Sequence, residues 1–199
     1  MKRFLAAAIA VLAWASCPAA FPAPAHPPLV IKKLAQKKVS ELPAGPLYWR
    51  IENFATISQA QAAAGPWSLV AESGGKVWLF TLGSAGGASP NGHKVAEVGP
   101  IARVAAPQYI LRINDASGAP GSMTKVHSHP GSEAFFVLQG EQSIRGPHGV
   151  LRVEAGQPQA GQGAGMPMQV SSTGSTSLHA LVMFVVDSGR PFSSPARMP

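Results

Sequence analysis

The chain has 199 residues, which is enough for one ordinary domain and hardly for two. Hydrophobic residues make up 46% of it and charged residues only 13%, so a core can be buried. The formal net charge is +7, but the basic residues are scattered apart from one cluster between Lys32 and Lys38, which is typical of a solvated segment. The charge therefore gives no case for a nucleic-acid partner.

The N-terminus has the pattern of a secretory signal peptide. Lys2 and Arg3 precede an unbroken apolar run over 4–15, which is too short to span a bilayer. The small-x-small sequence at 23–25 predicts cleavage after Ala25. We therefore expect residues 1–25 to be removed, the mature protein to be periplasmic or secreted, and no transmembrane segment.

The single cysteine, Cys17, lies inside this leader. A lipoprotein signal would lipidate it, but such a signal needs a Leu-like residue three positions earlier, where Trp14 stands. Lipidation is the weaker alternative. If the chain is cut after Ala25, the mature protein has no disulfide, no thiol nucleophile and no thiolate ligand.

The mature chain is predicted to begin with an arm and to continue as a barrel with a short helix near its N-terminus. Residues 26–46 are rich in Pro, Ala and Lys and predict a flexible arm. The barrel domain is expected over 47–199. Within it, residues 56–64 are the one good helix candidate, because Gly65-Pro66 stops a run of Ser, Gln and Ala.

Short apolar segments alternate with Gly- and Pro-containing turns through the rest of the chain. This even spacing is typical of a β-sandwich or barrel and predicts an all-β fold. The expected strands are 48–54, 67–72, 76–82, 95–104, 109–114, 125–129, 133–138, 142–145, 150–153 and 178–186.

One constellation of residues has the chemistry of a metal site. His127 and His129 are two positions apart, so in a strand both imidazoles point to the same side. The turn at Pro130-Gly131 returns the chain, and a tight hairpin would bring the Glu133 carboxylate to the two imidazoles. Two imidazoles and a carboxylate suit Fe, Mn, Ni, Cu or Zn, and burying them without a partner would be costly.

The stretch 121–140 resembles the first conserved motif of the cupin family, with every family-defining position filled. The resemblance implies a single antiparallel jelly-roll barrel with a metal inside. It also implies that His127, His129 and Glu133 are three of the ligands. Cupins include enzymes of several kinds, sugar-binding proteins and storage proteins, so the motif identifies a fold and a site but not a reaction.

The second cupin motif is eroded. Gly165 matches its glycine, but Gly163 stands where the family has proline and Ser172 where it has asparagine. Met168 occupies the position of the fourth ligand, which is a histidine in the family. The resemblance therefore covers about 109–186 and is strong only in its first half.

Met168 leaves three alternatives open. In the first alternative its thioether binds the metal, which would favour copper and especially Cu(I). Alternatively, His127, His129 and Glu133 alone hold Fe(II) or Mn(II) on an open face, and Met168 is a wall residue. In the third alternative the site is degenerate and Met168 fills the core.

Other residues are weaker candidates. His179 shares the strand face of Leu181, Met183 and Val185 and would point inward as a partner of the site, or would be an ordinary strand histidine near the barrel mouth. Lys125 shares the face of His127. No Ser-His-Asp pattern is visible in the sequence.

The lead hypothesis is an exported cupin that binds one Cu, Fe or Mn ion and performs metal-assisted chemistry on a small molecule in the barrel. The alternative is a non-catalytic protein for copper handling or small-ligand binding. The cupin resemblance also implies a homodimer, formed through sheet edges or through an exchange of the arm.

Overall fold

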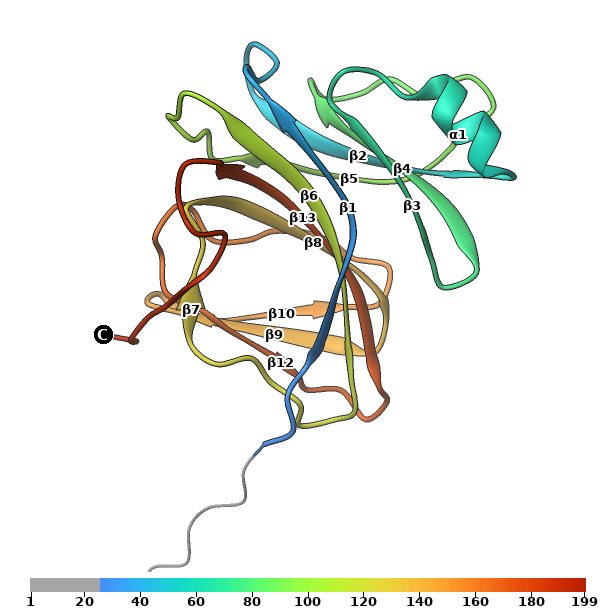
Figure 1. Cartoon of the computed structure of the whole chain (residues 1–199). Coiled ribbons are helices and arrows are strands. Elements are labelled where there is room, and N and C mark those ends of the chain that lie inside the picture. Colours follow the sequence, from blue (N-terminus) through green and yellow to red (C-terminus); the bar gives the residue numbers. More distant parts are fainter. Residues whose placement is uncertain (1–25) are drawn as a thin grey trace, which may run out of the picture.

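The computed structural model describes residues 26–199 (Figure 1). The predicted signal peptide, its cleavage after Ala25 and the lipidation of Cys17 concern residues 1–25, which lie outside the described residues. Within 26–199, no helix combines the length and the apolar character needed to cross a membrane. The fold is all-β with one short helix near its N-terminus, as predicted.

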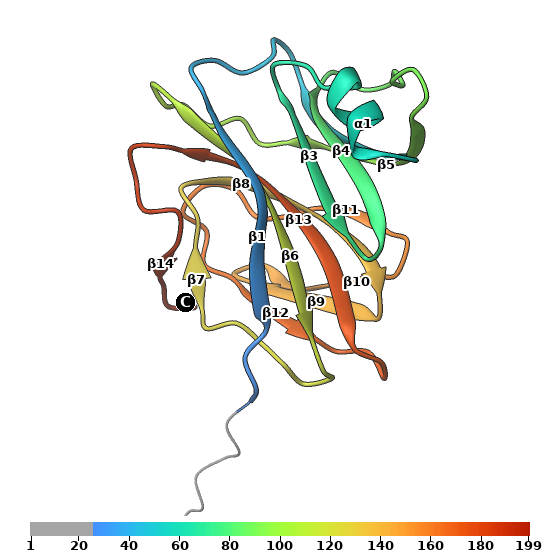
Figure 2. The same cartoon turned by 45° about the vertical axis from the view of Figure 1, so that its right-hand side comes forward.

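The chain forms three layers of antiparallel strands (Figures 1 and 2). The first layer has the strand order β3-β4-β2-β5. The helix α1 (Ile57–Ala63) joins β2 to β3, and Thr56 caps its N-terminus by accepting a hydrogen bond from the Gln59 amide at 3.2 Å. The strands of this layer are β2 (Leu47–Phe54), β3 (Ser68–Ser73), β4 (Lys76–Gly83) and β5 (His93–Ile101).

The middle layer has the strand order β1-β6-β13-β8-β11 and the third layer the order β10-β9-β12. A short pair, β7 with β14, lies beside them. The strands of the middle layer are β1 (Val30–Val39), β6 (Tyr109–Gly118), β8 (Gly131–Gln139), β11 (Pro158–Ala160) and β13 (Leu178–Asp187). The others are β7 (His127–Ser128), β9 (Glu141–Gly146), β10 (Gly149–Glu154), β12 (Gln169–Ser172) and β14 (Ser194–Pro195).

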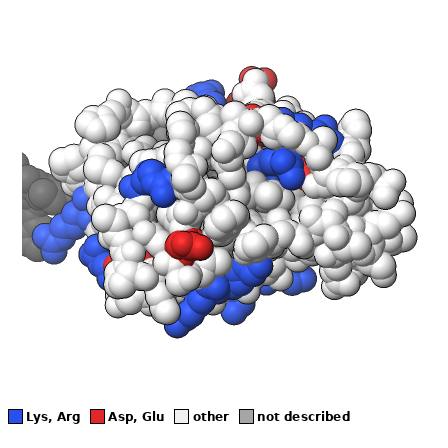
Figure 3. Space-filling view, turned by 90° about the horizontal axis from the view of Figure 1, so that it is seen from above, with Lys and Arg blue, Asp and Glu red and all other residues white. Residues whose placement is uncertain are grey.

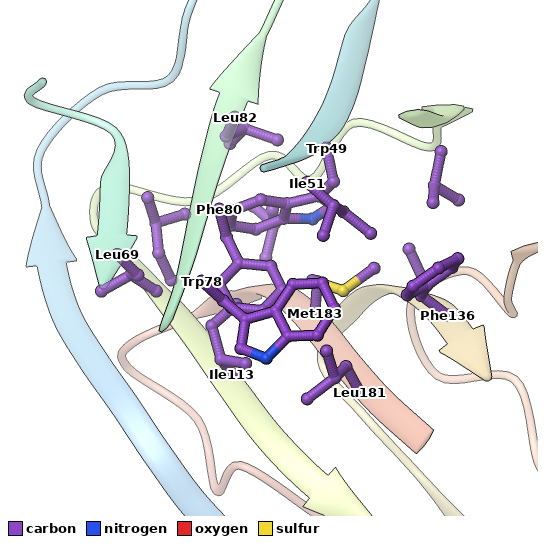
Figure 4. Packing of buried hydrophobic residues seen from close by; sticks show 14 of the residues in the cluster. Trp49, Ile51, Leu69, Trp78, Phe80, Leu82, Ile113, Phe136, Leu181 and Met183 are labelled. Carbon is purple, nitrogen blue, oxygen red and sulfur yellow. The ribbon is translucent and has the colours of Figure 1, made fainter. Parts of the chain in front are cut away.

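The middle sheet separates two hydrophobic cores. Its outer face packs against the first layer around Trp49, Trp78 and Phe136 (Figure 4). Its inner face packs against the third layer, and this second core is the inside of the barrel. The central strand β13 is covered on both faces, which explains why its sequence is apolar at nearly every position.

The backbone of the predicted motif is tightly packed at Gly131. A Cβ atom at this position would lie 2.1 Å from the Val185 carbonyl oxygen of β13, so only glycine allows the strands to approach. Gly131 opens β8, which carries Glu133. The close approach therefore fixes the place of Glu133 in the barrel.

Two sequence-based predictions need correction. Residues 26–46 are not a flexible arm, because Val30–Val39 forms β1 and pairs along its length with β6. Residues 47–101 form the first layer, which packs outside the barrel rather than contributing barrel strands. The expected strands from 48 to 186 are otherwise present with small shifts at their ends, and β11, β12 and β14 were not anticipated.

One face of the molecule shows how basic side chains are placed. On the face seen in Figure 3, lysine and arginine side chains stand in separate groups among uncharged residues, with few acidic side chains between them.

Candidate functional site

A cavity of about 400 Å³ opens on the inner face of the middle sheet. Strand alternation decides which side chains reach it. The even-numbered residues of β6 and β13 and the odd-numbered residues of β8 point into it, while their neighbours point to the first layer. The lining is completed by Ile31 of β1, by Val170 of β12, by parts of 124–129 and by Phe192 and Ser193.

His127, His129 and Glu133 all line this cavity. The centroids of the two imidazole rings are 5.0 Å apart, with the rings at 84° to each other. The two histidines therefore face the same side, as their spacing predicts. His129 is 5% exposed and Glu133 2% exposed, so both are interior groups.

The hairpin expected between the histidines and Glu133 is not present. β7 carries His127 and pairs with β14, whereas β8 carries Glu133 and pairs with β13 and β11. Pro130 therefore lies where the chain passes from one sheet to another, as at a barrel corner, and the three donors line one cavity without facing each other across a two-stranded ladder.

Backbone carbonyl groups fix the tautomer of both histidines. The Nδ1 atom of His127 lies 2.8 Å from the Lys125 carbonyl oxygen, and that of His129 lies 2.6 Å from the Phe192 carbonyl oxygen. A carbonyl oxygen only accepts, so each Nδ1 carries the proton and each Nε2 keeps its lone pair. This is the arrangement by which proteins orient metal-binding histidines.

Burial sets the charge of His129 and Glu133. It lowers the pKa of His129 to about 4, assisted by the nearby His127 and Arg112 and opposed by the bond to Phe192. Burial likewise raises the pKa of Glu133 to about 8. Among the described residues, the Glu133 carboxylate receives one long hydrogen bond, from the Gln162 amide at 3.4 Å. Both groups are therefore neutral near pH 7 unless a cation is bound.

The donors fit a metal ion in kind but are not assembled around one. Two Nε2 lone pairs and a poorly satisfied, buried carboxylate form a donor set that suits Fe, Mn, Cu or Zn. Within residues 26–199, however, no group of three or more His, Cys, Asp or Glu side chains is arranged so that it could hold a metal ion. Binding would therefore require side-chain rotation within the cavity.

Met168 lies beside His127 in the barrel interior. The two residues exchange backbone hydrogen bonds of 2.9 and 2.7 Å, so their side chains point to the same face. The Met168 side chain is 1% exposed and packs in the inner core, and it does not line the cavity. This packing is that of a core residue.

Aromatic and basic side chains complete the site, and of these Phe192, Phe184 and Arg112 were not singled out in the sequence. The ring of Phe192 lies 4.8 Å from that of His129 and 5.0 Å from that of Phe184, between centroids. The Arg112 guanidinium carbon lies 3.9 Å from the Phe192 centroid. Lys125 and Phe135 also line the cavity.

His179 is not part of this cavity. It lies on the outer face of β13, where its Nε2 atom is 2.7 Å from Asp115 Oδ2 and 3.0 Å from Ser73 Oγ. Ser73 Oγ also donates to Asp115 Oδ2 at 2.5 Å. One imidazole nitrogen contacts both partners, whereas a Ser-His-Asp triad uses the two nitrogens separately. The cluster therefore joins the β3–β4 turn to the middle sheet without forming a nucleophilic triad.

Comparisons with known proteins bear on the fold. No protein-family model matches the chain, and no curated protein sequence does. A cupin superfamily protein from Desulfitobacterium hafniense is 18% identical over 39% of this chain and 68% of its own, with a TM-score of 0.35. A cupin-like protein from Thermotoga maritima is 15% identical over 44% and 65%, with a TM-score of 0.39.

An oxalate oxidase in complex with the substrate analogue glycolate is 22% identical over 42% of this chain and 45% of its own, with a TM-score of 0.36. The chain thus spans less than two thirds of the T. maritima protein and less than half of the oxidase. Two of these three solved structures are a cupin superfamily protein and a cupin-like protein, the family that the sequence motif resembles. The likeness extends to no residue role or activity.

Proposed function

We propose that the protein binds a metal ion through His127, His129 and Glu133 and holds a small molecule beside it in the barrel cavity. The observation that carries the proposal is that these three side chains line one cavity of about 400 Å³. A cavity of this size is usual for a small-molecule site.

The chemistry of the surrounding residues supports this role. His129 is kept neutral by burial and oriented by the Phe192 carbonyl group, and a neutral imidazole is the form that binds metals. A bound Fe, Mn or Cu ion would supply Lewis-acid assistance to a small molecule. The chain itself would supply the aromatic wall around His129 and, at Lys125, a cation at the cavity lining.

Metal content tests the proposal directly. We would measure Cu, Fe, Mn and Zn by mass spectrometry in the mature protein and in the variants His129→Gln and His93→Gln. His93 is an exposed residue of β5 and serves as the matched control. We expect a stoichiometric ion in the wild type and in His93→Gln and its loss in His129→Gln. An apoprotein that stays empty after reconstitution with each ion would refute the metal site.

Met168→Leu decides whether copper handling is the better description. Loss of stoichiometric copper in this variant would support a thioether ligand, because Leu keeps the shape but not the sulfur. Iron or manganese that is retained in Met168→Leu would make Met168 a wall residue. That outcome would leave an open coordination face on the three remaining donors.

A metal-free small-ligand-binding protein is the second candidate. It is favoured by the finding that the donors of residues 26–199 are not assembled for a metal ion. It predicts that ligands bind with the same affinity in the presence of a strong chelator.

We also propose that the protein is exported, with the leader at 1–25 removed. The apolar run after Lys2 and Arg3 supports this proposal. Intact-mass measurement of the mature chain tests it, since cleavage after Ala25 leaves His26 first. A lipid-modified Cys17 at the N-terminus would contradict that cut and establish the lipoprotein alternative.

A further inference from the structure

Arg112 is a half-buried cation in the lining of the cavity, and two contacts hold its guanidinium group in place. It lies on the inner face of β6, and its Nε atom donates to Asn114 Oδ1 at 2.9 Å. Its guanidinium group stacks on the Phe192 ring at 3.9 Å. These two contacts fix the plane of the group, and the described residues give no hydrogen bond to either terminal nitrogen.

No carboxylate in the described part of the chain forms an ion pair with Arg112. Ion pairs are formed by other cations, namely Arg50, Lys94 and Arg152, each with its own acidic partner. Burial lowers the pKa of Arg112, which is the sign of a charge held partly away from water. A half-buried, unpaired guanidinium is unfavourable unless an anion comes to it.

The rest of the cavity indicates what kind of anion this is. Lys125 adds a second positive charge to the lining, and Glu133 is the one acidic residue there. The apolar part of the lining is partly aromatic and includes Phe135, Phe184 and Val182. A carboxylate fits the planar fork of an arginine through two parallel hydrogen bonds.

We propose that the cavity selects a small organic carboxylate with an apolar body, with the carboxylate on Arg112 and the body against the aromatic wall. This inference rests on the proposed small-molecule cavity, and it holds whether or not a metal ion is bound. Arg112 is thus the residue that determines specificity for an anion over a neutral molecule of the same shape.

Calorimetry with two isosteric pairs tests the inference. The carboxylates phenylacetate and hexanoate would be compared with phenylacetamide and hexanamide, using the wild type in chelator and after metal loading. We expect at least one carboxylate to bind about 10- to 100-fold more tightly than its amide in both states, as a charge-assisted pair predicts.

Three variants assign the effect to Arg112. We expect Arg112→Gln to abolish the preference for the carboxylate while leaving amide binding unchanged. Arg112→Lys keeps the charge without the fork and should retain part of the preference. Arg145→Gln alters an exposed arginine on β9 and should have no effect. Melting curves would show that each variant is folded.

The outcomes separate this inference from the metal proposal. A carboxylate preference that appears only with metal and survives Arg112→Gln would place the anion on the ion, overturning the inference and supporting the metal site. Equal affinity for acid and amide, or no binding of either pair at millimolar concentration, would also overturn the inference. A preference that depends on Arg112 in a protein that never takes up metal would uphold the inference and refute the metal site.

Discussion

At the scale of single residues, burial shifts the pKa values of Glu133 and His129 in opposite directions. Both are buried in one cavity, and burial disfavours whichever form is charged. The pKa of the acid therefore rises to about 8, and the pKa of the base falls to about 4. A bound cation would reverse the shift at Glu133, because it favours the carboxylate.

These shifts predict how the stability of the metal-free protein depends on pH. Between pH 4.5 and 6.5 the contributions of Glu133 and His129 oppose each other, because folding raises one pKa and lowers the other. Between pH 6.5 and 8 Glu133 is the one of these two residues that still contributes, and the free energy of unfolding falls by about 2 kcal/mol as pH rises. Urea unfolding at pH 6.5 and 8 measures this loss. It should be absent in Glu133→Gln, and an equal loss in that variant would contradict the assignment.

Gly161 controls the position of Glu133. A Cβ atom at 161 would lie 2.5 Å from Glu133 Cγ and 2.6 Å from Phe135 Cε2. We expect Gly161→Ala to displace these side chains, lower the free energy of unfolding by about 1–3 kcal/mol and weaken metal binding. Gly163→Ala is the control, since its nearest atom is 4.0 Å away. Thermal melts and metal titrations would show the contrast, and equal behaviour of the two variants would contradict it.

The sequence could predict the donors but not the residues that orient and surround them. His127, His129 and Glu133 lie within seven consecutive positions, so their pattern is visible in the sequence, although the hairpin expected to join them is absent. Phe192 reaches His129 from 63 positions away along the chain. Its place depends on the path of the C-terminal segment, for which the sequence has no local signal.

At the scale of elements, the strand predictions succeeded where apolar and polar residues alternate and failed at β1. This strand lies at the edge of the middle sheet and carries Lys32, Lys33, Lys37 and Lys38. Lysines on an edge strand discourage pairing with other chains, but they hide the period-two pattern that identifies a strand. The same residues therefore suggest a solvated arm in the sequence and protect a sheet edge in the fold.

The C-terminal segment is predicted to hold the metal site in shape. β14 pairs with β7, and the preceding Phe192 carbonyl group orients His129. Truncation after Arg190 removes both, and loss of such a supporting contact lowers metal affinity about 10- to 100-fold. Removal of 198–199 alone is the control, because it leaves β14 intact. Unchanged metal affinity in a folded chain truncated after Arg190 would refute this role.

The Ser73–Asp115–His179 cluster is predicted to fasten the first layer to the middle sheet. Ser73 is 8% exposed and contacts both partners. We expect Ser73→Ala to lower the free energy of unfolding by about 1 kcal/mol, through the loss of hydrogen bonds. Ser84→Ala, in an exposed loop, should change nothing. Urea unfolding distinguishes the two variants. A double-mutant cycle with Asp115→Ala should show that the effects of Ser73→Ala and Asp115→Ala are coupled. Additive effects would mean that the contact between Ser73 and Asp115 does not stabilise the fold.

At the scale of the whole molecule, the middle sheet contributes side chains to both hydrophobic cores. Alternation in a strand shows that one face is buried but not which sheet covers it. For this reason the sequence predicted an all-β fold correctly and yet placed 47–101 in the barrel. The stacking of the first layer depends on contacts far apart in the sequence, such as Trp78 with Phe136.

The homodimer stays a prediction. β1 pairs with β6 of its own chain, so an exchange of the arm would require that pairing to be replaced by a second copy. The outer edge of β1 has no strand beside it within the described residues, but its lysines disfavour edge-to-edge association at low ionic strength.

Because both cores share one sheet, the described part of the molecule should unfold as a single unit. Phe136 lies on the outer face of β8, is 4% exposed and contacts the Trp78 ring edge-on at 6.3 Å between centroids. We expect Phe136→Ala to lower the free energy of unfolding by about 3–5 kcal/mol. Tryptophan fluorescence, which reports on Trp49, Trp67 and Trp78 of the first layer, and far-UV circular dichroism should shift together. A fluorescence transition that precedes the loss of β-structure would instead mean that the first layer detaches while the barrel remains folded.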